Sequence, residues 1–290
     1  MKTLYFDCFS GMSGDMVIGT LIDAGADPIR LEEELKKLHI EEEYKLNWKK
    51  VIKNGITSTK FDVLLTNKDE HDHGHYSHEH RHHENHHVHN HDQANHEHDH
   101  DHHSHDDHEH THEHHYDHHH RTYQDIVHLI EASELSDEVK KTSLKIFKKI
   151  GEAEGHIHGM PLEKVHFHEV GAVDSIIDIV GAAVLIDQLQ IDIVKASPIA
   201  VGSGSIHIDH GIYPVPAPAA LEMLKEIPIQ QTTIKGELTT PTGAAILAVL
   251  AEDFCTLPSM KVKAIGYGAG TKTFKNQPNV LRVIIGEESR

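Results

Sequence analysis

The chain has 290 residues and a formal net charge of −19, and this acidic balance argues against nucleic acid as a partner. Its two cysteines, Cys8 and Cys255, provide no disulfide framework and fit the reducing cytoplasm. The longest apolar run, 176–186, contains Asp178 and is too short to span a bilayer, so we expect a cytoplasmic protein without a membrane partner.

Hydrophobic periodicity and turn residues predict the elements at the start of the chain. A buried strand is expected at 4–6, followed by helices at 14–24 and 28–38. The pair Asn54-Gly55 is a strong two-residue turn signal between β-prone runs. Residues 44–66 are therefore predicted to form a β-hairpin.

A histidine-rich tract follows at 71–120. Twenty-five of its fifty residues are His and twelve are Asp or Glu, against the single basic residue Arg81. With almost no aliphatic side chains, the tract is expected to be disordered until it binds a divalent metal; a solvated low-complexity linker is the alternative. The predicted organisation is an N-terminal part of the core at 1–69, a His-rich metal-binding insertion at 70–121, and the remainder of the core at 122–290.

After the tract, strands and helices are mixed without strict alternation. The pattern predicts helices at 123–132, 136–158, 173–189, 218–225 and 241–251, and β-prone runs at 191–201, 205–209, 229–234, 261–267 and 280–285. This arrangement is typical of an α/β or α+β fold, in which helices flank a mixed sheet.

A Ser/Gly loop leads from the first strand into the first helix, and its start could hold a phosphate with free backbone N–H groups. Two carboxylates in the loop would repel a bare phosphate, which suggests an intervening cation such as Mg²⁺. The alternative is a tight turn in which a serine caps the helix. The candidate cofactor-binding residues are Asp7, Ser10, Gly11, Ser13, Gly14 and Asp15.

Histidines and carboxylates lie close together further along the chain. In extended backbone His166 and His168 point to the same side, and Asp174 and Asp178 share a face of the next helix. Two imidazoles with carboxylates suit a divalent transition metal, so both histidines are candidate ligands. Glu169, Asp174 and Asp178 are candidate catalytic groups that act as ligand, orienting partner or base. An aspartate in an apolar helix is costly unless paired, which favours a function.

Two further groups carry a weaker signal. Glu152 and His156 lie one helical turn apart and could join the metal site, although a surface pair explains them equally well. Thr240 is a natural N-cap before Pro241, and with Thr242 it could offer hydroxyls to a phosphorylated ligand. The alternative for this second group is a purely structural role at the start of a helix.

These same stretches resemble a known family. Three stretches are similar to the LarC family. They are Phe6 to Met16, Val165-His166-Phe167-His168-Glu169-Val170-Gly171-Ala172-Val173-Asp174-Ser175, and Glu237 to Gly243. Those are the nickel-insertion proteins that complete the nickel-pincer cofactor of lactate racemase. The similarity covers essentially all of the chain outside the tract.

The resemblance implies a lyase-class nickel chelatase, or cyclometallase. Such an enzyme inserts Ni²⁺ into pyridinium-3,5-bisthiocarboxylic acid mononucleotide, forming two Ni–S bonds and one Ni–C bond while CTP is consumed. CTP, with Mg²⁺ or Mn²⁺, is expected to bind a C-terminal domain, fused or separate, that begins near where this chain stops. The sequence leaves open whether the chain forms a homo-oligomer.

Two rival interpretations remain at this stage. In the first, the chain is a non-catalytic nickel store or metallochaperone, and the tract at 71–120 is itself the function. In the second and weaker one, Asp7 and Asp15 serve a metal-dependent phosphohydrolase. Removing the tract separates the insertase from the store, because an insertase keeps its activity at excess nickel whereas a store loses its function. Release of phosphate from nucleotides or phosphate esters by the shortened chain tests the phosphohydrolase.

Overall fold

The computed structural model describes residues 1–66, 121–167, 172–208 and 211–288. They belong to a unit made of 1–67 and 119–290. The predictions made for the histidine-rich tract, for His168 and for Glu169 lie outside the described residues.

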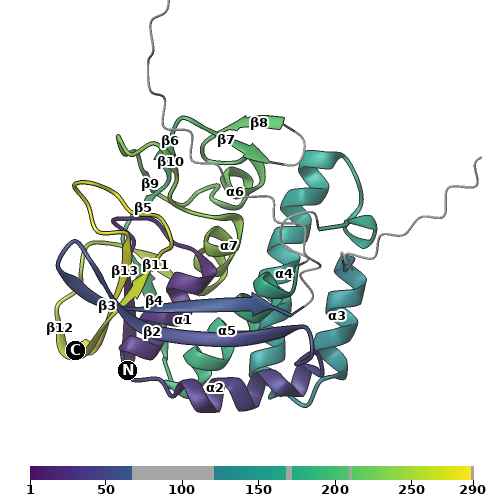
Figure 1. Cartoon of the computed structure of the whole chain (residues 1–290), viewed down its shortest axis with the longest axis horizontal. Helices are drawn as coiled ribbons and strands as arrows, with labels where there is room; N and C mark the ends of the chain where they lie inside the picture. The colour runs from purple at the N-terminus through teal and green to yellow at the C-terminus, as the bar shows by residue number, and fades with distance from the viewer. Residues whose placement is uncertain (67–120, 168–171, 209–210, 289–290) are drawn as a thin grey trace, which may run out of the picture. The chain divides into compact units, whose positions relative to one another are not determined.

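A seven-stranded mixed sheet is the central element of this unit (Figure 1), with the strand order β11-β4-β1-β13-β12-β3-β2. Its strands are β1 (Lys2–Asp7), β2 (Tyr44–Lys53), β3 (Ile56–Leu65), β4 (Ile193–Ala196), β11 (Asp253–Phe254), β12 (Met260–Ala269) and β13 (Val280–Glu288). β1 pairs in parallel with β4 and antiparallel with β13, and β3 pairs in parallel with β12 but antiparallel with β2. The predicted mixed sheet is confirmed, as is the hairpin turned by Asn54 and Gly55, both at positive φ.

Smaller two-stranded sheets occupy the chain between 199 and 237. They pair β5 (Ile199–Ala200) with β9 (Ile229–Gln230), β6 (Gly202–Ser203) with β10 (Gly236–Glu237), and β7 (Ser205–Ile208) with β8 (Gly211–Pro214). The β-prone run expected at 229–234 is therefore mostly loop. The very short strands β6, β8 and β10 gave no recognisable alternation in the sequence.

The helices begin and end close to the predicted residues. They are α1 (Gly14–Asp23), α2 (Pro28–Leu35), α3 (Tyr123–Ala132), α4 (Asp137–His158), α5 (Val173–Gln188), α6 (Pro218–Met223) and α7 (Pro241–Leu250). The expected extension of α2 is a 3₁₀ turn, Lys36–Leu38. α4 ends at His158 and is followed by Gly159, whose positive φ of 64° few other residues adopt readily. Among the described residues, no helix is long and apolar enough to cross a membrane.

α1 lies directly on the sheet because glycines remove the side chains between them. A Cβ atom on Gly266 or Gly268 of β12 would overlap the carbonyl oxygen of Thr20 or Met16 in α1. Met16, Val17 and Ile18 of α1 belong to the buried core, and α1 also packs against α5. The glycines and this core together fix where α1 begins.

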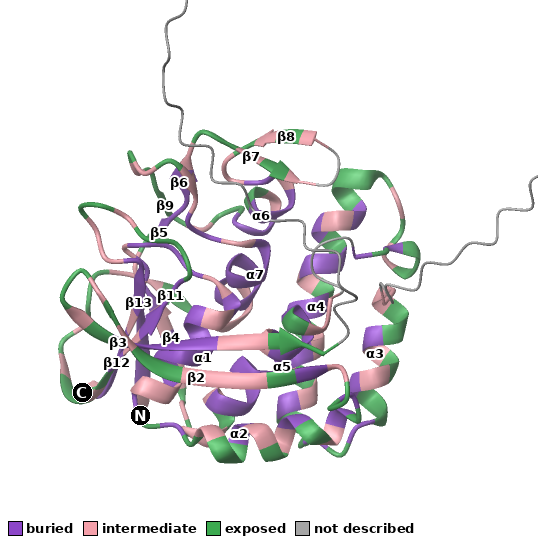
Figure 2. Cartoon of the chain, viewed as in Figure 1, coloured by how far each residue is buried: buried purple, intermediate pink, exposed green. Residues whose placement is uncertain are grey.

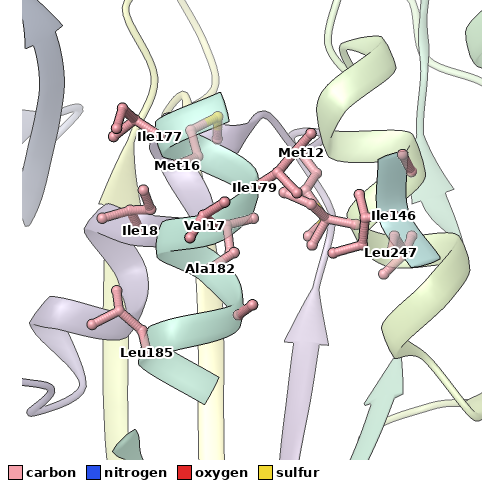
Figure 3. Packing of buried hydrophobic residues seen from close by; sticks show 14 of the residues in the cluster. Met12, Met16, Val17, Ile18, Ile146, Ile177, Ile179, Ala182, Leu185 and Leu247 are labelled. Carbon is pink, nitrogen blue, oxygen red and sulfur yellow. The ribbon is translucent and has the colours of Figure 1, made fainter. Parts of the chain in front are cut away.

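The helices that begin near one another share this core. Figure 3 shows Ile177, Ala182 and Leu185 of α5 near α1, with Leu247 of α7 and Ile146 of α4 beyond them. Figure 2 marks the inner faces of α5 and α7 as buried. Burial of each large aliphatic side chain stabilises the fold by about 1.5–3 kcal/mol, so the starts of these helices are held firmly.

The described residues on either side of 67–120 meet at Glu43. The backbone N–H of Thr66 donates to the carbonyl oxygen of Glu43 at 3.0 Å. The Arg121 guanidinium donates to the Glu43 carboxylate at 2.6 Å. The two flanks of the histidine-rich tract are thus held at one place on the core.

Candidate functional site

A cavity of about 400 Å³ lies where the first turns of α1, α5 and α7 approach β3. The residues of its lining that matter for chemistry are Asp15, Lys60, Asp174, Asp178, Glu237 and Thr242. A helix N-terminus carries the positive end of the helix dipole. Three such ends therefore favour negative charge in this cavity, whether it belongs to the protein or to a ligand.

Backbone contacts join the starts of α1 and α7. The N–H of Thr240 donates to the carbonyl oxygen of Met12 at 3.1 Å, and the N–H of Met12 donates to that of Leu238 at 3.1 Å. A Cβ atom on Gly243 would overlap the Met12 carbonyl, so only glycine allows this approach. The position of one helix start therefore depends on the other.

Asp178 lies one turn inside α5, facing the cavity. Its Oδ1 atom is buried and has no hydrogen-bond partner among the described residues. Its carboxylate packs against Gly14, where a Cβ atom would lie 2.5 Å from the Asp178 Cβ. Burial raises the pKa of Asp178 well above its usual value, and the charges of Asp15 and Asp174 raise it further. Lys60 and a hydrogen bond from the Asp15 backbone oppose this rise only in part.

Asp174 lies at the rim of the cavity, open to solvent on one side. Partial burial raises its pKa, and the charge of Asp15 adds to the rise. Backbone N–H groups lower it, including that of Ser175, which donates to Asp174 at 2.8 Å. The accessible Asp174 and the enclosed Asp178 thus form an acidic pair on one face of α5.

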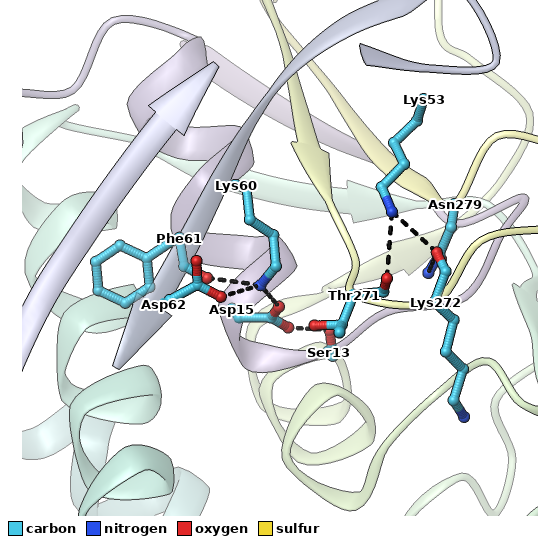
Figure 4. A network of polar contacts seen from close by, with 9 residues as sticks. All are labelled: Ser13, Asp15, Lys53, Lys60, Phe61, Asp62, Thr271, Lys272 and Asn279. Atoms are coloured by element: carbon cyan, nitrogen blue, oxygen red, sulfur yellow. Dashed lines mark hydrogen bonds and ion pairs between the residues drawn. The ribbon is translucent and has the colours of Figure 1, made fainter. Parts of the chain in front are cut away.

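Asp15 has a cation beside it, unlike Asp178. Figure 4 shows the Lys60 ammonium between Asp15, at 2.7 Å, and Asp62, at 2.8 Å. Lys60 also donates to the carbonyl oxygen of Phe61 at 2.8 Å. Burial alone would lower the pKa of Lys60, but the two carboxylates outweigh burial and raise it. The hydroxyl of Ser13 contacts the other oxygen of Asp15, so both Asp15 oxygens are engaged.

The cavity gathers residues from three separate motifs of the sequence. The predicted site residues that line it are Ser13, Gly14, Asp15, Asp174, Asp178, Thr240 and Thr242. Ser13 is the N-cap of α1 by position, but its hydroxyl does not cap the helix. The hydroxyl of Thr240 does cap α7, accepting from the Gly243 N–H at 3.2 Å.

Three predicted residues of the first loop do not line the cavity. Asp7 is paired with Arg282 of β13, whose Nε donates to it at 2.9 Å. Ser10 donates to the carbonyl oxygen of Pro278 at 2.7 Å. Gly11 has φ +83° and lies against Leu238, where no side chain would fit. Each has a structural role in this fold; their assignment to a cofactor stays a prediction.

Two of the predicted histidine ligands, His166 and His156, are described and do not line the cavity. His166 is exposed and bridges to Thr122, while the neighbouring Phe167 is buried with Tyr123 at a ring-centroid distance of 6.4 Å. Glu152 pairs with Lys148 at 3.7 Å and His156 with Glu222 at 3.9 Å. Within the described ranges, no three His, Cys, Asp or Glu side chains gather in a geometry that could hold a metal ion. The ligand assignments therefore stay predictions.

Sequence reasoning did not select Lys60, Asp62 or Glu237 as site residues. Lys60 and Asp62 belong to β3 and line the cavity beside Asp15. In a half-buried strand, charged residues at alternate positions ordinarily face water, so their pattern does not distinguish a buried charge. Glu237 lies within a stretch that resembles the LarC family, and that resemblance was the available signal.

One family of known proteins matches nearly the whole chain. The family described as "Nickel insertion protein" matches residues 4–290. The chain belongs to the nickel insertion protein family. The family expected from the motifs is thereby confirmed.

Curated members of the nickel insertion protein family align with the whole chain. It is 48% identical over 290 residues to the pyridinium-3,5-bisthiocarboxylic acid mononucleotide nickel insertion protein of Geobacillus kaustophilus, covering all of this chain and 61% of the relative. The protein of the same name from Clostridium acetobutylicum is 49% identical over 288 residues, 99% of this chain and 64% of the relative. The chain thus spans less than two thirds of these relatives' length. No solved structure matches it.

Proposed function

We propose that this chain takes part in nickel insertion, with Ni²⁺ and pyridinium-3,5-bisthiocarboxylic acid mononucleotide as its substrates. Family membership supports the reaction class, and the relatives' names supply the acceptor. The observation that carries the proposal is the Asp178 carboxyl group. It faces the cavity beside two other carboxylates and has a buried oxygen without a partner among the described residues.

The reaction needs a proton acceptor. Two Ni–S bonds form to the thiocarboxylate sulfurs, and one Ni–C bond forms as a ring C–H bond breaks. The electron pair of that bond passes to nickel, the proton passes to a base, and nickel remains Ni²⁺. A carboxylate whose pKa is raised is a stronger base than an ordinary aspartate once it is ionised, which suits Asp178.

The charge of the cavity suits a dication. Among its described lining residues, five carboxyl side chains face one ammonium, that of Lys60. Entry of Ni²⁺ would favour the ionised form of Asp178 and so prepare it to accept a proton. Asp174, at the accessible rim, would meet the arriving ion. The softer sulfur atoms of the acceptor would then draw nickel away from carboxylate oxygens.

CTP is the cofactor that the family resemblance implies. In the described lining of the cavity, the ammonium of Lys60 is already held by Asp15 and Asp62, and no arginine is present. The high negative charge of a triphosphate therefore does not fit these residues. In this proposal CTP binds elsewhere, on a C-terminal domain that is fused or separate.

Mass spectrometry of the mononucleotide after incubation with Ni²⁺, CTP and Mg²⁺ tests the proposal. The reaction is run with this chain alone, with this chain plus the C-terminal part of the Geobacillus relative, and with the intact relative as positive control. We expect a product that has gained nickel and lost the ring proton in at least one reaction that contains this chain. Absence of that product from both, with the intact relative active, would overturn the proposal.

Deletion of 71–120 separates insertion from storage. The tract holds twenty-five histidines, which is the observation that favours a nickel store or metallochaperone. We expect the shortened chain to retain nickel insertion at saturating Ni²⁺ and to lose it only at limiting Ni²⁺. Loss at saturating Ni²⁺ would favour the store.

A further inference from the structure

The starts of α1 and α7 face the same cavity but differ in what occupies them. At α1, the backbone N–H of Asp15 already binds the Asp178 carboxylate, and Asp15 adds a negative charge to the first turn. At α7, the first turn contains no acidic residue. The anion-binding capacity of α1 is therefore used by the protein itself, whereas that of α7 is not.

Thr242 supplies the donors at the start of α7. This residue is only 8% exposed and lines the cavity, and no side-chain hydrogen bond joins it to another described residue. Pro241 has no N–H group, and the N–H of Gly243 is capped by Thr240. The hydroxyl and backbone N–H of Thr242 remain as two donors on one residue, beside the positive end of the helix.

Two lysines contact residues that line this part of the cavity. Lys53 donates to the carbonyl oxygen of Thr271, a lining residue, at 3.2 Å (Figure 4), and to that of Lys272 at 3.1 Å. Lys272 in turn donates to the carbonyl oxygen of Glu237 at 3.1 Å. Glu237 also lines the cavity, and Lys272 contacts it at its backbone.

We propose that the first turn of α7, through Thr242, binds the phosphate of the mononucleotide and directs its pyridinium ring toward Asp178. This subsite rests on the proposed function, since it assigns one end of that substrate. It places the phosphate at α7 and not at the loop 10–15, whose adjoining helix start is taken by Asp178. A carboxylate-rich end for the metal and a hydroxyl-bearing end for the phosphate give the substrate one orientation.

Equilibrium binding tests this subsite without nickel or CTP. The whole chain is titrated by calorimetry with the mononucleotide and with the nucleoside obtained by removing its phosphate. We expect Thr242→Val, which keeps the shape of the side chain, to raise the Kd of the mononucleotide roughly tenfold to a hundredfold, since hydrogen bonds to charged groups are strong. The Kd of the nucleoside should not change.

Thr242→Ser should restore mononucleotide binding, because the hydroxyl returns. Thr256→Val is the matched control, since Thr256 is exposed and does not line the cavity. Equal weakening of both ligands by Thr242→Val, or no weakening, would overturn the phosphate subsite while nickel insertion stands. If the wild-type chain binds neither ligand, the subsite and the proposed substrate fail together.

Discussion

Asp7 and Asp178 show how differently one fold treats two aspartates. Asp7, at the end of β1, is paired with the guanidinium of Arg282 on the neighbouring strand. Asp178 lies within the apolar helix α5, and its Oδ1 has no donor among the described residues. A buried carboxyl group without a cation is costly unless it serves a purpose. The contrast supports a stabilising role for Asp7 and the proposed chemical role for Asp178.

The largest expected effect comes from Asp178→Asn. Without a proton acceptor, the rate of nickel insertion should fall roughly 10²-fold to 10⁴-fold, the range typical of general base catalysis. The rate is measured by mass spectrometry under the conditions in which the wild-type chain forms product. Asp7→Asn is the matched change and should leave the rate within about twofold. A full rate for Asp178→Asn would remove the distinction between the two aspartates.

Gly14→Ala should also impair insertion, by moving the Asp178 carboxylate. The new Cβ would lie 2.5 Å from the Asp178 Cβ and would overlap its Oδ2, so the acid must shift. Misplacement of a reacting group by about 1 Å can cost roughly 10²-fold in rate. The insertion rate of the variant is measured against that of the wild type. Far-ultraviolet circular dichroism should show that the variant is folded. An unchanged rate in a folded variant would argue against the assigned base.

Asp7→Asn should act on stability. Loss of the charge-assisted hydrogen bonds to Arg282 should lower the free energy of unfolding by about 1.5–3 kcal/mol, measured by urea denaturation. A double-mutant cycle with Arg282→Gln isolates the pair, and its coupling energy should be at least about 0.5 kcal/mol. Additive effects would show that the two side chains do not stabilise the fold as a pair.

The smallest effect is a change in the pH dependence of stability. Burial, then the charges of Asp15 and Asp174, raise the pKa of Asp178 above its unfolded value. Between these two pKa values the native state binds more protons than the unfolded state, so the free energy of unfolding falls as pH rises. The Asp178→Asn variant does not lose stability in this way. Its free energy of unfolding should therefore rise relative to that of the wild type between about pH 4 and neutral pH. A constant difference in urea denaturation at pH 4 to 7 would contradict the raised pKa.

The sequence predicted those parts of the site that depend on local signals. A Ser/Gly loop, a Thr-Pro helix start and two aspartates four residues apart are patterns within a few residues. Helix caps and periodicity therefore located the starts of α1, α5 and α7 to within one or two residues. What brings the three starts together is the shared core, which no local pattern reveals.

Long-range pairing accounts for what the sequence did not reveal. Asp7 has the same residue type as Asp15, yet its partner Arg282 is 275 positions away, so its structural role was invisible. Lys60 reads as an ordinary polar residue of a strand, and only the packing of β3 against α1 places it beside Asp15. Ion pairs between distant segments therefore decide which carboxylates are already paired and which can act in the candidate site.

Because Thr66 and Arg121 both contact Glu43, the segment between 66 and 121 is a suitable place to insert foreign sequence. Because the flanks are held together by the core, the closure cost of whatever joins them rises only slowly with its length. A fluorescent protein or a different metal-binding peptide spliced between 66 and 121 should leave the sheet and its helices intact. The chain could then carry a different inserted segment at this position.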